Sequence, residues 1–240
     1  MAKLGQSIPI KLGISETFDC SYLPNQSERL VIALDEVVYN PESYEQLMQI
    51  GFRRSGEQVY RPYCESCQAC QSVRIRTDSF KPSRSQKRLL KKANHFTVKL
   101  QPSIKDPLIY YPLYKKYIEL RHSDGSMYPP SEEQFSGFVK ADWLTEVFLE
   151  IYDADKLIAV SVLDLLPHAL SAVYTFFDPD YQDHSPGTLA ILKATQFCQS
   201  LKLDYLYLGY QVDDCRKMNY KTKFKPYQRL EHNVWVEYED

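Results

Sequence analysis

The sequence predicts a mixed α+β fold in which helices pack against an antiparallel sheet. Three strand-like segments, at 147–153, 157–166 and 170–178, follow one another with short turns, which predicts an antiparallel meander. Two helix-like segments precede the meander, and a helix-like and a strand-like segment follow it. The chain has 240 residues, of which 44% are hydrophobic and 25% charged, so it can form one large or two modest domains with packed cores.

The other elements are predicted by apolar periodicity and by helix-capping residues. Near the N-terminus, "PESYEQLMQIGF" predicts a helix that Gly51 ends. The remaining helices, apart from the basic one described below, are predicted at 107–122, 131–141 and 184–201. Strands are predicted at 205–210 and 233–238, in "SVRIRT", and as other short runs in the N-terminal part. Ser185 and Pro186 suit the N-cap and the first position of the last helix.

We expect a domain boundary near residue 103, which divides the chain into an N-terminal cysteine-containing, basic domain (1–102) and a second domain (103–240). In the second domain the order of elements is two helices, a three-strand meander, a helix and a strand. This order resembles that of the acyltransferase fold of the Gcn5-related N-acetyltransferases (GNAT). Because one fold hosts many activities, the analogy does not establish chemistry.

Composition and charge argue against several classes of protein. No apolar run approaches the ~18 residues of a membrane span, and the N-terminus lacks the pattern of a signal peptide, so we expect a cytoplasmic protein with no membrane partner. The net charge of −2 does not indicate a nucleic-acid partner, so such a role must rest on local clusters. Only eight glycines are present, which leaves few places for a Gly-rich phosphate loop.

Three cysteines are evenly spaced in "YRPYCESCQACQSVRIR", namely Cys64, Cys67 and Cys70. Closed zinc and iron–sulfur sites need four protein ligands, so a fourth must come from elsewhere in the chain. Cys20 is the natural candidate because it lies in the same predicted domain. The spacing does not separate zinc from an iron–sulfur cluster, and free thiols are the alternative.

The segment "FKPSRSQKRLLKKANHF" predicts a helix with one strongly basic face. Ser83 and Gln86 form a capping box at its start. The basic side chains are Lys81, just before the helix, and Arg84, Lys87, Arg88, Lys91 and Lys92 along it. An ordinary solvated face interleaves charges of both signs, whereas here like charges stand at i, i+3 and i+4 and repel one another. We therefore interpret this face as a surface that binds nucleic-acid phosphates.

A second basic cluster, "YLGYQVDDCRKMNYKTKFKPYQRL" (207–230), interleaves cations with aromatic residues. Its members include Tyr210, Lys217, Tyr220 and Lys221. Aromatic rings among cations suit stacking on unpaired nucleotides, as at the single-stranded end of a tRNA. Aromatic residues that face the core are the alternative interpretation.

Four segments together resemble the aminoacyl-tRNA–protein transferases of the N-degron pathway, and most closely their bacterial aspartate/glutamate leucyltransferase branch. They are "GFRRSGEQVYRPYCESCQACQSVRIR", "FKPSRSQKR", "RHSDGSMYP" and "YLGYQVDDCRKMNYKTKFKP". The resemblance implies transfer of leucine from leucyl-tRNA to the N-terminal α-amine of acceptor proteins that begin with Asp or Glu. Eukaryotic members commonly have C-x2-C near the N-terminus. Here Cys20 is kept, but Leu23 occupies the position of the second cysteine, so Cys64 becomes the expected replacement thiol.

The resemblance also implies roles for particular residues. The reaction is aminolysis of an ester, which needs no nucleotide cofactor, and the expected proton acceptors are His122, Asp124 and Asp178. Arg53, Arg54, Arg74 and Arg76 are the candidates for binding an acidic side chain, and Tyr174 and Phe176 for lining a leucyl pocket. The expected tRNA-binding residues are Lys81, Arg84, Lys87, Arg88, Lys91, Lys92, Tyr210, Lys217, Tyr220 and Lys221. The expected ligands of a zinc ion or iron–sulfur cluster are Cys20, Cys64, Cys67 and Cys70.

Three other functions stay open on the sequence. The donor could carry arginine in place of leucine. An acetyl-CoA-dependent acyltransferase would share the fold, although the segment before its helix, "DHSPGTLAI", has a single glycine. A non-catalytic zinc protein that binds RNA would use only the first 100 residues and leave the second domain without a role.

Overall fold

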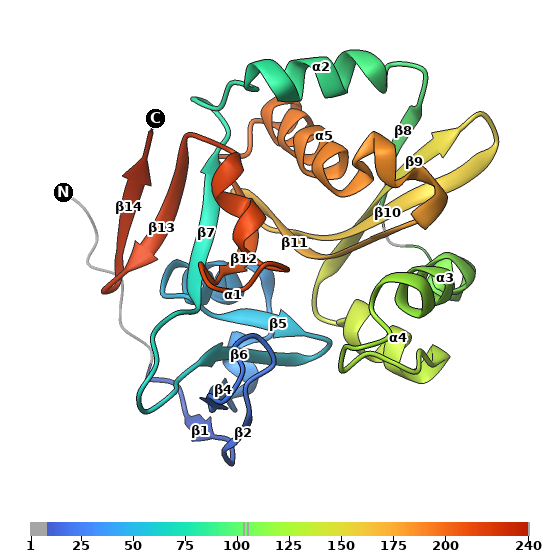
Figure 1. The fold of residues 1–240 in the computed structure, drawn as a ribbon. Helices are drawn as coiled ribbons and strands as arrows, with labels where there is room; N and C mark the ends of the chain where they lie inside the picture. The colour runs from blue at the N-terminus through green and yellow to red at the C-terminus, as the bar shows by residue number, and fades with distance from the viewer. Residues whose placement is uncertain (1–8, 103, 105, 240) are drawn as a thin grey trace.

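The protein is described by a computed structural model that covers residues 9–102, 104 and 106–239 (Figure 1). It is a mixed α/β structure around an eight-stranded sheet with the order β14-β13-β7-β12-β11-β10-β9-β8. The strands are β7 (Gln71–Arg76), β8 (Thr97–Pro102), β9 (Thr145–Asp153), β10 (Lys156–Leu165), β11 (Ala169–Phe177), β12 (Tyr205–Gln211), β13 (Tyr227–Glu231) and β14 (Val234–Tyr238).

The N-terminal region forms two smaller sheets. The four-stranded one has the order β1-β4-β6-β5, and the other pairs β2 with β3. Their strands are β1 (Leu12–Ile14), β2 (Phe18–Asp19), β3 (Ser27–Glu28), β4 (Leu30–Ala33), β5 (Arg53–Ser55) and β6 (Gln58–Pro62). Figure 1 shows β5 and β6 at the lower end of β7.

The helices begin and end close to where the sequence predicts. They are α1 (Pro41–Gln49), α2 (Arg84–Lys92), α3 (Tyr111–Arg121), α4 (Glu132–Val139) and α5 (Pro186–Leu201), with 3-10 turns η1 (Glu36–Val38), η2 (Pro107–Tyr110), η3 (Pro179–His184) and η4 (Asn219–Lys223). The predicted capping box is confirmed: Ser83 Oγ accepts from the Gln86 amide, and the Gln86 side chain accepts from the Ser83 amide. The helix predicted over 107–122 begins as the 3-10 turn η2.

The predicted meander is confirmed, because β9 pairs antiparallel with β10 and β10 with β11. Two strands of the eight-stranded sheet went unpredicted. β8 adds to the outer edge of β9, and β13 pairs with both β7 and β14. Both are short and half-exposed, so they lack the long apolar run that marks a central strand.

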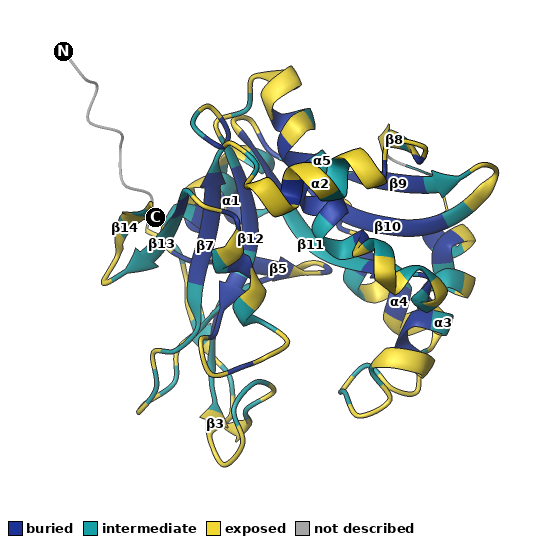
Figure 2. Cartoon of the chain, turned by 45° about the horizontal axis from the view of Figure 1, so that its top comes forward, coloured by how far each residue is buried: buried dark blue, intermediate teal, exposed yellow. Residues whose placement is uncertain are grey.

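The central strands of the sheet are largely buried (Figure 2). Their side chains alternate across the sheet and build cores on both of its faces. On β9, Leu149 and Ile151 pack toward α2 and α5, while Phe148 packs toward α3 and α4. On β12, Leu206 packs toward α5 and Tyr207 toward α1. The α1 block and the α3/α4 block therefore share the sheet face opposite α5.

The predicted domain boundary falls on residue 103, which lies outside the described residues. Strands from both sides of it, β7 and β8 before and β9 to β14 after, belong to the same sheet. Across the described part of the chain, every helix is too short or too polar to cross a lipid bilayer.

Candidate functional site

The central sheet opens between β11 and β12. These parallel strands pair only over Ala169–Ser171 and Tyr205–Tyr207. A bulge before Gly209 then shifts the register of β12 on β7, and the pairing with β11 does not continue. Residues 172–175 and Gly209 are consequently half-buried, although they lie within an eight-stranded sheet. Backbone groups freed by the separation need other partners, so the opening is a natural place for a ligand site.

Two buried cations occupy this opening. From β5, Arg53 donates from Nη2 to the carbonyl oxygen of Ala172 (2.6 Å), and its Nη1 has no hydrogen-bond partner among the described residues. From η4, Lys221 donates from Nζ to the carbonyl oxygen of Tyr210 (2.6 Å). Gly209 has a φ of +82°, and a Cβ at this position would lie 3.7 Å from Arg53 Nη2. A glycine here thus lets the guanidinium approach the strand.

Neither cation has an acidic partner within the described part of the chain. Arg53 is 7% exposed and Lys221 is 3% exposed. Burial, followed by the charge of Arg53, lowers the pKa of Lys221 to about 7, while the thiols of Cys215 and Cys70 act in the opposite direction. At neutral pH Lys221 is therefore divided between its ammonium and amine forms.

The C-terminal end of α3 carries His122. Its Nε2 lies 3.0 Å from the hydroxyl oxygen of Tyr117. Burial, followed by the positive charges of Lys217 and Arg121, lowers the pKa of His122 below its usual range, so the imidazole is neutral at pH 7. Lys217 Nζ donates to both carboxylate oxygens of Asp124 at 3.0 Å, which ties the loop after α3 to the segment before η4.

Tyrosine side chains connect the end of α3 with the opening. The ring of Tyr220 in η4 lies 4.9 Å from Lys221 Nζ. Burial raises the pKa of Tyr174 on β11, and the nearby phenols of Tyr117 and Tyr220 raise it further. The structure thus gathers seven of the predicted residues: Arg53, His122, Asp124, Tyr174, Lys217, Tyr220 and Lys221.

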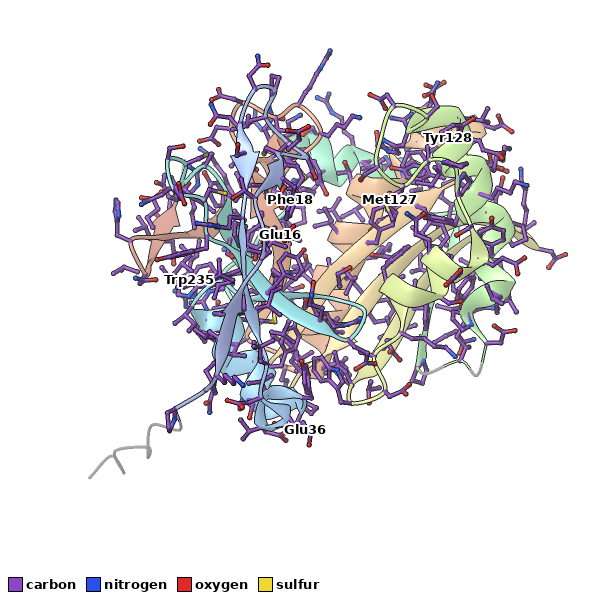
Figure 3. The ribbon with its side chains drawn as sticks, turned by 90° about the horizontal axis from the view of Figure 1, so that it is seen from below. Glu16, Phe18, Glu36, Met127, Tyr128 and Trp235 are labelled. Atoms are coloured by element: carbon purple, nitrogen blue, oxygen red, sulfur yellow. The ribbon has the colours of Figure 1, made fainter. Side chains whose placement is uncertain are left out.

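An open space separates the two blocks on this face. Seen from below, Glu16 and Phe18 lie on one side of it, and Met127 and Tyr128, from the loop between α3 and α4, lie on the other (Figure 3). The rings of Phe18 and Tyr128 are exposed, at 43% and 49%. Large rings from distant parts of the chain therefore flank the space.

The two basic segments predicted to bind RNA adjoin each other. All six predicted cations of the α2 region are exposed, and no ion pair between described residues includes one of them. Gln86 Nε2 on α2 donates to the carbonyl oxygen of Lys223 in η4 (3.0 Å). Figure 1 shows α2 lying over α5, beside the C-terminal segment. Helix α2 and the basic segment around η4 are consequently neighbours, in contact through the buried side of the helix.

Two of the predicted carboxylate-binding arginines are engaged inside the fold, which corrects the sequence interpretation. Arg54 is fully buried and donates to Asp164 Oδ1 from Nε (2.9 Å) and Nη2 (2.5 Å). Arg74 lies between the rings of Tyr205 and Trp235, with its Cζ 3.8 and 4.0 Å from the ring centroids. Neither guanidinium is free to meet a substrate.

Other predicted residues are also placed away from the opening or inside the core. Arg76 pairs with Asp78 at the far end of β7. Phe176 is fully buried among aromatic rings that include Phe135. Tyr210 is 6% exposed and its hydroxyl donates to the carbonyl oxygen of Gly51 (2.9 Å), so its ring offers no surface for stacking on a base.

Asp178 is a structural carboxylate. Its oxygens accept from Lys116 (2.5 Å) and Lys156 (2.9 Å), and it caps η3 by accepting from the Asp180 amide. Burial alone would raise the pKa of Asp178, but the hydrogen bonds from these two lysines lower it to about 2. A carboxylate this acidic and this well paired is a poor proton acceptor, which corrects its predicted role.

The four predicted cysteine ligands line one cavity of about 420 Å³. Cys20 Sγ accepts from the amides of Tyr22 and Leu23, both at 3.4 Å. Burial, followed by the charges of the neighbouring cysteines, raises the pKa of Cys70 to about 12, so its thiol is protonated unless a cation binds beside it. Among the described residues, no three His, Cys, Asp or Glu side chains stand close enough together to hold a metal ion. Thiolates are ligands that zinc and iron–sulfur clusters prefer, so the donor chemistry of the four cysteines fits such a group.

Sequence reasoning missed Tyr117 and Gly209. Gly209 did carry a signal, because a glycine inside the strand pattern "YLYLGYQ" marks a bulge or a close backbone approach. Tyr117 carried none, since it is one of several tyrosines on an ordinary amphipathic helix.

The chain has a mixed α/β architecture of the acyltransferase-like class. A similar architecture is found in the solved C-terminal domain of a protein named as a lysylphosphatidylglycerol synthetase of Agrobacterium fabrum. The two share 10% identity and a TM-score of 0.50 over 71% of this chain and 59% of that one, which shows the fold alone.

Sequence models of the arginine-tRNA-protein transferase family match the chain twice. The N-terminal model matches residues 18–88, and the C-terminal model matches residues 109–231. The chain is 47% identical over 227 residues to a protein of Vibrio cholerae named aspartate/glutamate leucyltransferase, covering 94% of this chain and 96% of the relative. It is 46% identical over 230 residues to the protein of that name from Aeromonas hydrophila, covering 96% of each. The chain belongs to the arginine-tRNA-protein transferase family, which confirms both the predicted family and the prediction of an enzyme.

Proposed function

We propose that the protein transfers leucine from leucyl-tRNA to the N-terminal α-amine of proteins that begin with aspartate or glutamate. The names of its family and of its relatives support this activity. Two structural observations carry it: the exposed basic face of α2, and a sheet opening that holds two buried cations without acidic partners among the described residues. RNA phosphates fit the first feature, and an acidic acceptor fits the second. The product would then be recognised by the degradation machinery of the N-degron pathway.

The donor would bind across α2 and the exposed part of the C-terminal basic segment. The cations of α2 would contact phosphates, which position an RNA without reading its sequence. Tyr220 is 39% exposed and lies beside the opening, so its ring is available to stack on the unpaired 3′ end. Lys217, whose Nζ donates to the carboxylate of Asp124, would contact the same end of the RNA. The leucyl group would then reach Tyr174 on β11.

The reaction would join the acceptor nitrogen to the ester carbonyl carbon and break the bond from that carbon to the ribose oxygen of the tRNA. The acceptor ammonium must lose one proton before attack, and after attack the same nitrogen gives up a second proton, which the leaving ribose oxygen gains. With Asp178 held by two lysines, we assign the first proton transfer to His122, whose neutral imidazole is hydrogen-bonded to Tyr117. Because the ester is already activated, no nucleotide cofactor is needed.

The pH dependence of transfer tests the role of His122. Protonation would remove its ability to accept a proton, so the activity should be present at pH 7 and be lost only as the pH falls through a value below ~6.5. Replacing it, H122Q, should lower kcat by about 100-fold at pH 7 and remove this low-pH loss. H168Q is the matched control, because His168 is exposed and its ring pairs with Glu45 on the surface. Unchanged kcat in H122Q would contradict the assignment.

The finer features of the architecture also belong to the proposal. We assign the region from the meander to β12 to a GNAT-like unit, preceded by a cysteine-containing N-terminal domain whose boundary lies near residue 103. The four cysteines would hold a zinc ion or an iron–sulfur cluster after a small inward movement of their loops. Such a group would hold these loops in place, and no step of the transfer is assigned to it.

We place the reaction in the cytoplasm, where charged tRNA is available.

The decisive experiment offers the purified protein leucyl-tRNA, arginyl-tRNA or acetyl-CoA together with peptides that begin with Asp, Glu or Lys. Transfer of leucine to the Asp and Glu peptides alone is the expected result. Transfer from arginyl-tRNA in its place would change the assigned donor. Acetylation without any aminoacyl transfer would overturn the proposed function, and so would RNA binding with no transfer at all.

A further inference from the structure

The cations of the sheet opening form a pair whose positive charge the described part of the fold does not balance. We propose that Arg53 and Lys221 together bind the side-chain carboxylate of the acceptor's first residue and so select Asp and Glu over Asn and Gln. This inference rests on the proposed function and deepens it by naming the acceptor site. It assigns Lys221, which the sequence places among the tRNA-binding residues, to the acceptor.

Arg53 and its neighbour Arg54 on β5 differ in whether a carboxylate of the described fold balances their buried charge. Removing a charged side chain from water costs several kcal/mol unless a partner of opposite charge replaces the water. Arg54 has such a partner in Asp164, at 2.5 Å. Arg53 and Lys221 are similarly buried and have none among the described residues, and their like charges oppose each other. A bound carboxylate would balance this charge.

The hydrogen bonds of the pair leave donors free for such a ligand. Arg53 uses Nη2 on the Ala172 carbonyl, and its buried Nη1 is left without a partner in the described structure. Lys221 makes one short bond, to the Tyr210 carbonyl, and two long contacts to Met218, at 3.5 Å and 3.7 Å. The two carbonyls belong to β11 and β12, so each cation is fixed to one side of the opening. The two oxygens of a carboxylate would accept from both sides.

Hydrogen bonding to the carbonyl oxygens of Ala172 and Tyr210 does not explain why both donors are charged side chains. A neutral donor, such as an asparagine or a glutamine, would satisfy a single carbonyl oxygen without bringing a charge into the interior. The opening is also accessible, since Gly209 and residues 172–175 are half-buried. A ligand side chain can therefore approach the pair.

An RNA phosphate is the competing anion, and the site's enclosure argues against it. A polynucleotide backbone needs an open groove, and the exposed α2 side chains already offer one surface of that kind. Arg53 and Lys221 lie within the sheet layer and are more than nine-tenths buried. The end of a single short side chain fits such a site better than a continuous backbone does.

Direct binding of peptides tests the proposal without tRNA. Calorimetry would compare peptides that differ only in Asp or Asn at the first position, on the wild-type protein, on K221M and on K115M. Lys115 is an exposed lysine of α3 and controls for net charge. We expect K221M to weaken Asp-peptide binding about 10- to 100-fold, to leave Asn-peptide binding unchanged, and to abolish the discrimination between them. K115M should match the wild type.

Other outcomes separate this inference from the proposed function. If K221M keeps the preference for Asp, the inference is wrong even where leucine transfer proceeds. If K221M instead raises KM for leucyl-tRNA and leaves acceptor selection intact, the anion is an RNA phosphate and the inference is overturned. If the wild type transfers no leucine but binds the Asp peptide through Lys221, the acceptor site stands and the proposed transfer fails.

A measurement on the wild-type protein does not depend on any variant's folding. Burial and then the charge of Arg53 lower the pKa of Lys221 to about 7, and the thiols of Cys215 and Cys70 act to raise it. These are the ionisable groups that act on Lys221. A bound carboxylate would raise the pKa of Lys221, so at pH 8 the Asp peptide should bind with uptake of about one proton, and the Asn peptide with none. The affinity for Asp should fall as the pH rises above about 7. Equal proton uptake for the two peptides would refute the site.

Discussion

A triple variant of α2, K87A/R88A/K91A, is expected to raise KM for leucyl-tRNA about 100-fold while leaving kcat nearly unchanged. The three side chains are exposed on one helical face and have no ion-pair partner among the described residues. Removing the cation from one phosphate should cost about 1 kcal/mol of binding free energy, and three such removals combine to about two orders of magnitude in affinity. Since these residues lie outside the sheet opening, bound tRNA should still react at the normal rate.

The salt dependence of tRNA binding gives this prediction a second readout. The slope of log affinity against log salt concentration should become shallower by about 0.7–0.9 for every phosphate that is no longer neutralised. The control variant removes three exposed lysines elsewhere, K99A/K115A/K202A, for the same change in net charge. If both variants weaken binding equally, long-range attraction rather than docking on α2 explains the effect, and the assignment of α2 fails.

Local sequence signals predict the helices and the meander because their causes are local. The capping box at Ser83 and Gln86 defines the start of α2, and the short turn after Asp153 defines the hairpin between β9 and β10. The basic face of α2 is predictable for the same reason, since its i, i+3 and i+4 spacing is visible within nine residues. A surface charge pattern needs no knowledge of the rest of the fold.

The roles of individual cations could not be predicted, because they depend on distant partners. Arg53 and Arg54 are adjacent and look alike in "GFRRSG", but on a strand they point to opposite faces. Arg54 meets Asp164, which lies 110 residues further along the chain, and Arg53 meets the opening of the sheet. In the sequence Lys221 resembles its exposed neighbours Lys223 and Lys225, and only the turn of η4 directs it inward.

The buried ion pair between Arg54 and Asp164 should have the largest effect on stability. Replacing one partner, D164L, leaves a guanidinium in the interior without its counterion and is expected to lower the free energy of unfolding by about 3–5 kcal/mol. The exposed pair of Arg76 and Asp78 is the matched control, because its nitrogen–oxygen distance is also short, at 2.8 Å. Breaking it, with D78A, should cost less than about 1 kcal/mol. Urea unfolding of both variants measures the difference.

The double variant R54M/D164L separates the charge from the hydrogen bonds to the backbone. If the uncompensated charge dominates, removing both partners should recover most of the stability that D164L loses. Full recovery is not expected, since Arg54 also donates to the carbonyl oxygens of Val139 (3.0 Å) and Gly56 (3.2 Å) and so ties β5 to the end of α4. If the double variant is less stable than D164L, those backbone hydrogen bonds matter more than the charge. Arg54 would then be a brace between the two blocks that flank the open space, and its removal should also weaken acceptor binding at the neighbouring Arg53.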